Sequence, residues 1–509
     1  MQNFATRLLS PLVTFIDRTT MYKMLLYALS GLVFSSILLG FFGLVYPSPL
    51  SQVLSLLLAV GLALCLSYGL ALIRGVLANH ESSIITGLIL FFLVNPAESL
   101  SECVPMIVAV TVAMVSKYVF VYRRQHLVNA AAMGVFVLWL SGYGTASWWI
   151  ATPFMFAPLI IAGVLVISKV RKWILVAAFL GSGFLVFLFE EWRVDSNLGE
   201  TWSLFFLSYP ALFLGFFMLT EPFSMPPTKK LQAWYGVLVG VLSNTSFVPS
   251  FMSMTPELAL VVGNLVFYPS TLRRKLVLTL ESKQVIATQM WEFIFTKPAH
   301  ICFKAGQYLE WMLPHKNADS RGIRRYFTIA SSPTEPKLRV IVKIPTPGSS
   351  YKTKLQSLKV GEQIICSQLA GDFVLPKNPL QKIGMVAGGV GVTPFRSMIT
   401  YITDMKYPSD VVLYYGANTW AEVAYMPEFA QASELMPLRL ILVLAKETKL
   451  DCEEGYVNAA MIMRQSPDYK ERVWYVSGPP GMVAGATSML RSLGIPSRHI
   501  MQDFFPGLA

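Results

Sequence analysis

One short segment, Arg325-Tyr326-Phe327-Thr328, combines an arginine, two aromatic rings and a hydroxyl in a β-rich stretch. A guanidinium can bind a pyrophosphate through two parallel hydrogen bonds, and an aromatic ring can stack on a planar ring system. We therefore expect this strand to bind a flavin, with Phe327 against the isoalloxazine and Thr328 at its N5 edge. Taken alone, the segment also fits an ordinary core strand that carries an exposed arginine.

Two further segments have the composition of anion-binding turns. Gly348-Ser349-Ser350 follows a predicted strand and precedes a helix, where backbone N–H groups form an anion site. Gly388-Gly389-Val390-Gly391-Val392-Thr393-Pro394 lies between a buried strand and a helix, where glycines let a nucleotide pyrophosphate approach the helix start. Simple turns are the alternative in both places. The alternation of strand, loop and helix after residue 379 predicts a doubly wound α/β layer.

The motifs of residues 280–509 resemble those of the ferredoxin–NADP reductase superfamily. The patterns R-x-[YF]-[ST], G-x-F-x-L-P, G-G-x-G-x-T-P and G-P-P-x-M occur here in that order. The resemblance implies an FAD-binding β-barrel over 280–378 and an NAD(P)-binding domain over 379–509. It also implies FAD binding by Arg325, Tyr326, Phe327 and Thr328, with its pyrophosphate on Gly348, Ser349 and Ser350. The nicotinamide nucleotide is expected on Gly389, Gly391, Thr393, Gly478, Pro479 and Met482.

Three positions bear on the expected reaction and on the choice of nucleotide. Ser477 stands where many members of the superfamily have cysteine beside the nicotinamide, so we expect activity below the usual rate. Asn418 replaces an arginine that often binds a 2′-phosphate, which favours NADH over NADPH. Asp503 is expected to approach the flavin–nicotinamide stack, and Phe504 or Phe505 to shield the flavin or simply pack. Thr328, Ser477 and Asp503 are the predicted catalytic residues.

The N-terminal half has the composition of a membrane domain. Of the 509 residues 54% are hydrophobic and only 14% charged, whereas soluble domains average about 25% charged. Ten apolar runs fall at roughly 22–45, 50–73, 82–95, 102–120, 126–141, 147–168, 173–190, 202–220, 231–247 and 255–270. A span needs about 20 residues, so the third and fifth runs are expected to be half-helices or re-entrant segments that line a site.

The charge pattern predicts how this domain, residues 1–275, is oriented. Basic residues recur on one side of ten crossings, at Arg18, Lys23, Arg74, Arg123, Arg124, Lys169, Arg171, Lys172, Lys229, Lys230, Arg273, Arg274 and Lys275. The opposite loops are mainly acidic, with Glu98, Glu102, Glu190, Glu191, Asp195 and Glu200. The positive-inside rule then predicts a multi-pass protein of the inner cell membrane with both termini and the reductase half in the cytoplasm. This explains the net charge of +12 without a nucleic-acid partner.

Metal-centred electron transfer is not expected. The five cysteines have neither iron–sulfur nor disulfide spacing. The histidines of the membrane half are His80 and His126, too few to ligate two haems axially.

Three polar stretches interrupt the apolar runs: Glu81–Gly87, His126–Gly134 and Leu214–Pro222. Small and polar residues at these places could serve only close helix packing. Together, however, they resemble the D subunit of the Rnf electron-transport complex and the B subunit of sodium-translocating NADH:quinone reductase, over most of residues 20–275. This resemblance implies FMN or riboflavin in the membrane half. The D-x-x-S-x-A-T sequence for covalent attachment is not found, so we expect a noncovalent flavin near the three stretches.

The two halves together predict a membrane flavoprotein oxidoreductase. It would take hydride from NADH or NADPH onto FAD in the cytosol and pass electrons to the membrane flavin. From there electrons would reach an extracytosolic flavoprotein carrier or a quinone. An anchored NAD(P)H:quinone or flavin reductase without a membrane redox group is one alternative, and a redox-linked ion transporter is the other.

Overall fold

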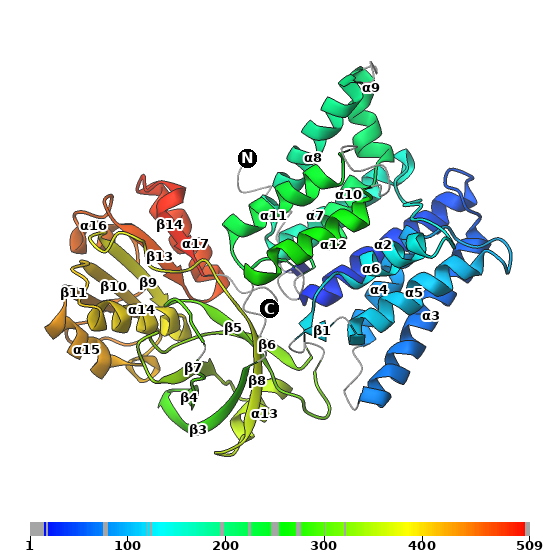
Figure 1. Cartoon of the computed structure of the whole chain (residues 1–509). Helices are drawn as coiled ribbons and strands as arrows, with labels where there is room; N and C mark the ends of the chain where they lie inside the picture. Colours follow the sequence, from blue (N-terminus) through cyan, green and yellow to red (C-terminus); the bar gives the residue numbers. More distant parts are fainter. Residues whose placement is uncertain are drawn as a thin grey trace. The chain divides into compact units, whose positions relative to one another are not determined.

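A computed structural model of the chain describes residues 15–16, 19–74, 80–119, 121–122, 125–193, 198–221, 225–245, 254–270, 276–299, 301–319 and 322–503. The chain divides between Arg274 and Lys275 into two compact units, which Figure 1 colours by sequence and which are described separately. The proposed shielding residues Phe504 and Phe505 lie outside the described residues, as does the basic cluster Arg273–Lys275.

The N-terminal unit is almost entirely helical. Its helices are α2 (Met21–Phe41), α3 (Pro49–Arg74), α4 (His80–Leu93), α5 (Cys103–Val119), α6 (Ala130–Leu140), α7 (Phe156–Val170), α8 (Trp173–Arg193), α9 (Leu198–Ser203), α10 (Ala211–Phe213), α11 (Lys229–Leu242) and α12 (Pro256–Phe267). In the described part of the chain, four helical segments are long and apolar enough to cross a membrane, or five if one bent pair is a single span. Ten crossings remain a prediction from the hydropathy pattern.

The third and fifth apolar runs form short helices, in agreement with their length. α4 has 14 residues, and every residue from Ile85 to Leu93 is buried inside the unit. α6 has 11 residues and lies very close to α5. A Cβ atom added at Gly134 would be 2.4 Å from the carbonyl oxygen of Ala109, so this helix crossing requires glycine.

The eighth apolar run is a broken helix rather than a straight span. α9 continues as a π-helix over Leu204–Ser208, and α10 continues as a π-helix over Leu214–Met218. The two parts are bent by 53° at the break. Pro210 occupies the break, and a proline ring lacks the N–H that would continue the helix.

The C-terminal unit begins with an antiparallel sheet that curls into a barrel. Its strands are β3 (Leu276–Ala287), β4 (Met290–Thr296), β5 (Tyr308–Met312), β6 (Arg324–Thr328), β7 (Lys337–Lys343) and β8 (Gln363–Ala370), in the order β6-β5-β8-β3-β4-β7. The outer strands approach each other where the N–H of Ala330 donates to the carbonyl of Arg339 at 2.8 Å. One helix, α13 (Ser350–Ser357), follows β7.

The second layer is a parallel sheet with helical connections, as predicted. Its elements are β9 (Ile383–Gly388), α14 (Thr393–Asp404), β10 (Val411–Ala417), α15 (Met426–Leu435), β11 (Leu438–Leu444), β12 (Glu453–Glu454), α16 (Ala459–Gln465), β13 (Val473–Ser477), α17 (Pro480–Ser492) and β14 (Ile500–Gln502). The strand order is β12-β11-β10-β9-β13-β14. All six residues of β9 are buried, as expected of a parallel strand covered on both faces.

The strand order of this sheet fixes where a ligand can bind. The chain runs outward from β9 through β10 to β12, then crosses to β13 on the other side. Ligands of open α/β sheets bind at such a switch point, beyond the carboxyl ends of the strands. Here these ends are Gly388 and Ser477.

The barrel and the parallel sheet share a hydrophobic core. One cluster of buried side chains contains Met290 and Ala330 of the barrel together with Phe395 and Met398 of α14. The two subdomains therefore form one packed body, in which groups from both can be held in register.

Candidate functional site

Arg325 and Phe327 lie on the same face of β6. Strand alternation places them there, and both contact the buried ring of Tyr351. The guanidinium of Arg325 lies 5.0 Å from the centre of that ring, and the ring centroids of Phe327 and Tyr351 are 6.0 Å apart. Phe327 also faces Trp311 at 6.4 Å, so its ring packs on the barrel core.

The predicted pyrophosphate donors converge on a single carboxylate. Arg325 Nη2 donates to Asp319 Oδ1 at 3.1 Å, and the backbone N–H of Ser350 donates to Asp319 Oδ2 at 3.2 Å. Ser349 caps α13 by accepting a hydrogen bond from the N–H of Lys352. Two segments that are separate in sequence thus form one anion site, and its donors fit a pyrophosphate.

Two members of this anion site were not predicted from the sequence. His315 Nε2 lies 3.0 Å from Ser350 Oγ, and Asp319 N–H donates to the same oxygen at 2.8 Å. Both residues belong to the loop between β5 and β6, which carries no motif. Only the fold brings this loop to the start of α13.

The opposite face of β6 carries Tyr326 and Thr328. The ring of Tyr326 meets Tyr308 edge-on at 5.6 Å, and its hydroxyl donates to Gln368 Oε1 at 3.0 Å. Thr328 is buried and pairs with Tyr308 in the ladder. Burial raises the pKa of Tyr308, and the nearby carboxylates of Asp372 and Asp503 raise it further. The face that carries Thr328 is therefore the one near Asp503.

This arrangement bears on the ring-stacking prediction. Tyr326, and not Phe327, is the aromatic residue on the Thr328 face. Stacking of the isoalloxazine on Phe327 stays a prediction, and the structure adds Tyr326 as a second candidate for that role.

The predicted nucleotide residues come together at the switch point. Gly389, with φ +51°, begins the turn after β9, and Thr393 Oγ1 donates to the carbonyl of Val390 at 2.6 Å. A Cβ atom at Gly391 would lie 2.4 Å from the carbonyl oxygen of Ser477. The first glycine turn therefore touches the second one, so Gly391 is required by the packing of the chain itself.

Met482 closes the second turn. A Cβ atom at Gly478 would lie 2.7 Å from Met482 Sδ, and one at Gly388 would lie 3.2 Å from Pro479 Cδ. Gly389, Gly391, Thr393, Gly478, Pro479 and Met482 are thus neighbours at the carboxyl ends of β9 and β13.

Two of the three predicted catalytic residues are in direct contact. Ser477 Oγ donates to Asp503 Oδ2 at 3.0 Å, and the N–H of Asp503 donates to the carbonyl of Val476. Ser477 is buried, and its single hydroxyl proton is used by the carboxylate. Its oxygen can still accept a hydrogen bond, while Asp503 supplies negative charge at the end of β13.

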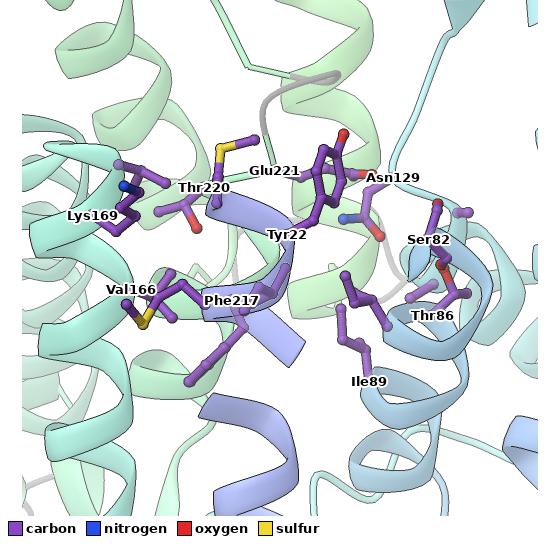
Figure 2. Close-up of a pocket in the computed structure, with 17 residues that line it drawn as sticks. Tyr22, Ser82, Thr86, Ile89, Asn129, Val166, Lys169, Phe217, Thr220 and Glu221 are labelled. Atoms are coloured by element: carbon purple, nitrogen blue, oxygen red, sulfur yellow. The ribbon is translucent and has the colours of Figure 1, made fainter. Parts of the chain in front are cut away.

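The three polar stretches of the N-terminal unit meet at one pocket (Figure 2). Ser82 and Thr86 come from α4, Asn129 from the start of α6, and Thr220 and Glu221 from the turn after the π-helix Leu214–Met218. The other lining residues are Met21, Tyr22, Met24, Leu25, Ile85, Ile89, Ala130, Ala131, Val166, Lys169, Val170 and Phe217. The pocket therefore combines a polar rim with an apolar wall.

Hydrogen bonds hold the polar groups of this pocket in place. Lys117 Nζ donates to Ser82 Oγ at 3.0 Å and to Thr86 Oγ1 at 2.7 Å. The side-chain amide of Asn129 donates to the carbonyl of Met218. The backbone N–H of Asn129 donates to Asn264 Oδ1. The sequence did not single out Lys117 or Asn264, because each lies within an apolar helix without a motif. Within the described residues no group of three or more metal-binding side chains occurs.

Comparisons with known proteins agree with the C-terminal geometry. Residues 385–488 match the family described as the oxidoreductase NAD-binding domain. The chain is 28% identical over 219 residues to the glycine betaine monooxygenase reductase subunit of Chromohalobacter salexigens, covering 42% of this chain and 59% of that protein. It is 25% identical over 218 residues to the propane 2-monooxygenase reductase component of Mycolicibacterium goodii, covering 41% of this chain and 61% of that protein.

A solved structure is similar over a comparable share of the chain. The Amycolatopsis cytochrome P450 reductase GcoB is 21% identical, with a TM-score of 0.42, over 47% of this chain and 72% of that one. The chain spans 59% and 61% of the length of the two curated relatives named above. The predicted similarity of the C-terminal half to nicotinamide-nucleotide-binding reductases is confirmed. The resemblance of the N-terminal half to the Rnf and quinone-reductase subunits stays a prediction.

Proposed function

We propose that this chain is an FAD-dependent NAD(P)H oxidoreductase that passes electrons on to an acceptor held by its membrane half. The observation that carries the proposal is the meeting of the two glycine turns with Ser477 and Asp503 at the switch point of the sheet. That place lies in one packed unit with the β6 strand. When bound, FAD and the nicotinamide nucleotide supply the hydride chemistry.

In this scheme the residues of the chain bind the flavin and the nucleotide and orient them. Arg325 and the N–H groups at the start of α13 hold the flavin pyrophosphate. The turns at Gly391 and Gly478 hold the nucleotide at the ends of β9 and β13. Asp503 would lie near the nicotinamide ring, where its negative charge would stabilise the positive charge that develops on the ring as hydride leaves it. No general base is needed.

We propose NADH as the preferred nucleotide. The segment after β10 is where the ribose of a bound nucleotide lies in such sheets. Asn418 Nδ2 donates to Glu422 Oε2 at 3.1 Å, and the N–H of Trp420 donates to Glu447 Oε2 at 2.7 Å. Lys343 Nζ lies 3.9 Å from Glu422 and Lys449 Nζ lies 3.3 Å from the centre of the Trp420 ring, so cations balance part of this negative charge. Both carboxylates can accept hydrogen bonds from a ribose hydroxyl, which a 2′-phosphate cannot donate, and this favours NADH.

The pocket of the N-terminal unit supports onward transfer. We propose that it holds a noncovalent FMN or riboflavin, from which an extracytosolic carrier or a quinone takes electrons. Its polar groups can bind ring carbonyls, while Phe217, Ile89 and Val166 can contact the ring faces. Residues 1–275 then span the membrane with both termini and the two reductase domains, 280–378 and 379–509, in the cytoplasm.

Flavin content tests both parts of the proposal. The detergent-purified wild type should contain FAD and a second flavin, both extractable with acid. Arg325→Ala should lower the FAD content alone, and Thr86→Val, which removes a hydroxyl of the pocket rim, should lower the content of the second flavin alone. One FAD per chain would favour an anchored reductase without a membrane redox group. Ion-dependent turnover in sealed vesicles would favour the transporter. Unchanged FAD content and NADH oxidation in Arg325→Ala would contradict the flavin site.

A further inference from the structure

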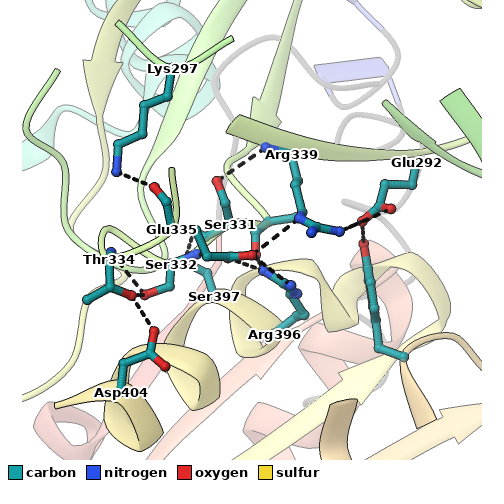
Figure 3. A network of polar contacts seen from close by, with 12 residues as sticks. Glu292, Lys297, Ser331, Ser332, Thr334, Glu335, Arg339, Arg396, Ser397 and Asp404 are labelled. Carbon is teal, nitrogen blue, oxygen red and sulfur yellow. Dashed lines mark hydrogen bonds and ion pairs between the residues drawn. The ribbon is translucent and has the colours of Figure 1, made fainter. Parts of the chain in front are cut away.

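A buried polar network joins the barrel to the parallel sheet (Figure 3). At its centre Arg396, in the first turn of α14, meets Glu335 of the loop before β7. Arg396 Nη2 donates to Glu335 Oε1 at 3.0 Å, and Nη1 binds the other carboxylate oxygen, so the pair is bidentate. The side chain of Arg396 is 5% exposed and that of Glu335 16%, so solvent screens the pair weakly.

Neighbouring charges extend the pair across the subdomain boundary. Arg339 Nε lies 3.2 Å from Glu335 Oε1, and Arg339 Nη1 lies 3.4 Å from Glu292 Oε1. Glu292 also accepts a hydrogen bond from the hydroxyl of Tyr425 at 2.5 Å. Two arginines therefore balance two carboxylates, with a tyrosine of the parallel-sheet domain bonded to the barrel strand β4.

The network is bonded directly to the segments that follow both predicted binding sites. Arg396 Nη1 donates to the carbonyl of Ala330 at 3.2 Å, and Ser397 Oγ donates to the carbonyl of Ser331 at 2.6 Å. Ala330 comes two residues after Thr328 on the flavin strand, and Arg396 comes three residues after Thr393 of the nucleotide turn. Hydrogen bonds therefore connect the predicted flavin strand to the predicted nucleotide helix within two or three residues of Thr328 and Thr393.

We propose that Arg396 and Glu335 form a clamp that sets the distance between nicotinamide and flavin, and that both are positioning residues. This inference rests on the proposed function. Hydride transfer needs reacting atoms about 3–3.5 Å apart, and a misplacement of about 1 Å can cost about 100-fold in rate. The shared hydrophobic core, which includes Met290, Phe395 and Met398, holds the subdomains together even without the clamp. Loss of the clamp therefore shifts the subdomains relative to each other and does not separate them.

Pre-steady-state reduction of the full-length protein in detergent tests the clamp. Glu335→Gln keeps the shape of the side chain and removes its charge, while Arg396→Met keeps the apolar stem. Each should lower the rate of FAD reduction at saturating NADH by about tenfold or more. FAD content and the affinity for NAD⁺ should stay within about twofold of the wild type. The double variant should be about as slow as either single variant, because both remove one interaction.

Two more measurements separate positioning from general destabilisation. Amide hydrogen exchange should rise in residues 330–335 and 393–398 of the clamp variants and stay unchanged elsewhere in the unit. Arg464→Met is the control, because it breaks an ion pair with Glu453, 2.6 Å long, whose arginine is 61% exposed. That variant should reduce FAD at the wild-type rate.

The possible results are distinct. Unchanged reduction rates in Glu335→Gln would overturn the clamp, and so would a parallel loss of rate, FAD and NAD⁺ affinity. If Arg396→Met does not fold, the rate of FAD reduction in Glu335→Gln alone tests the clamp. A wild type whose FAD is reduced by neither NADH nor NADPH would overturn the proposed function and the clamp with it. A normal wild-type rate with an unchanged variant rate would overturn the clamp alone.

Discussion

The hydroxyl of Ser477 donates a hydrogen bond of 3.0 Å to the carboxylate of Asp503, which is the last residue that the structure describes. This bond joins the carboxyl end of β13 to the segment after β14. A charge near the chain end is thereby held at the switch point where the nucleotide turns meet. We therefore expect the serine to act by orienting the carboxylate of Asp503.

Ser477→Ala should lower the rate of NADH oxidation without lowering the FAD content. The variant leaves Asp503 without its hydroxyl partner, and the acid is then less well placed at the reaction centre. We expect NADH oxidation to fall about tenfold at unchanged FAD content, because a misplacement of about 1 Å near the reacting atoms can cost up to about 100-fold in rate. Ser492→Ala, which removes an exposed hydroxyl of α17, should have no effect in the same steady-state assay. Equal rates for both variants would exclude a role for Ser477.

Arg325 and Asp319 should have opposite effects on FAD affinity. Arg325→Ala removes a charged donor to the pyrophosphate and should weaken FAD binding by about 1.5–3 kcal/mol, roughly 10- to 100-fold. Asp319→Asn removes the internal carboxylate that occupies the same donors, so we expect tighter FAD binding. Flavin fluorescence during titration of the flavin-free protein measures both affinities. Weaker binding in Asp319→Asn would mean that the acid orients Arg325 and does not compete.

Gly391→Ala should weaken nucleotide binding and spare FAD. The added methyl group would lie 2.4 Å from the carbonyl oxygen of Ser477, so one of the two turns must move. We expect the KM for NADH to rise at least tenfold. Gly481→Ala is the matched control, since nothing lies within 4 Å of its added carbon. Its kinetics should match the wild type.

Asn418→Arg should shift the nucleotide preference toward NADPH. The new guanidinium would stand beside the segment after β10 and could pair with a 2′-phosphate. The wild type should have the higher kcat/KM with NADH, and the variant should raise the kcat/KM for NADPH while lowering that for NADH. Steady-state kinetics with both nucleotides measures this ratio. A wild type that prefers NADPH would contradict the argument drawn from Glu422 and Glu447.

The C-terminal unit should lose stability in acid partly through Asp468. Burial alone would raise the pKa of Asp468, but hydrogen bonds from Arg472 and Lys382 lower it overall. A carboxylate with a depressed pKa stabilises fully above its unfolded pKa, about 3.9, and loses this contribution as pH falls through the folded pKa. Because its side chain is 22% exposed, we expect about 1 kcal/mol.

The temperature at which heated, intact protein releases its flavin, followed by flavin fluorescence, measures this loss of stability in acid. The midpoint temperature of the wild type should fall more steeply between pH 5 and pH 3 than that of Asp468→Asn. Parallel curves would show that other carboxylates dominate the acid transition.

Local features of this protein could be predicted because they depend on residues that are consecutive in the sequence. The strand from Arg325 to Thr328 and the glycine turns at Gly389 and Gly478 depend on side-chain alternation and on backbone freedom. The short lengths of α4 and α6 follow from short apolar runs. The parallel sheet follows from the alternation of strands and helices.

Partnerships between distant residues were decided by the path of the chain. Ser477 with Asp503, Ser350 with Asp319, and Arg396 with Glu335 each join separate elements of the chain, and no local periodicity encodes such pairs. The same holds for the three polar stretches of the N-terminal unit, which share one pocket only because their helices pack together. The sequence by itself determined the kinds of groups that could bind flavin and nucleotide. Tertiary packing decided which of them meet, because contact depends on how elements cross and not on their order.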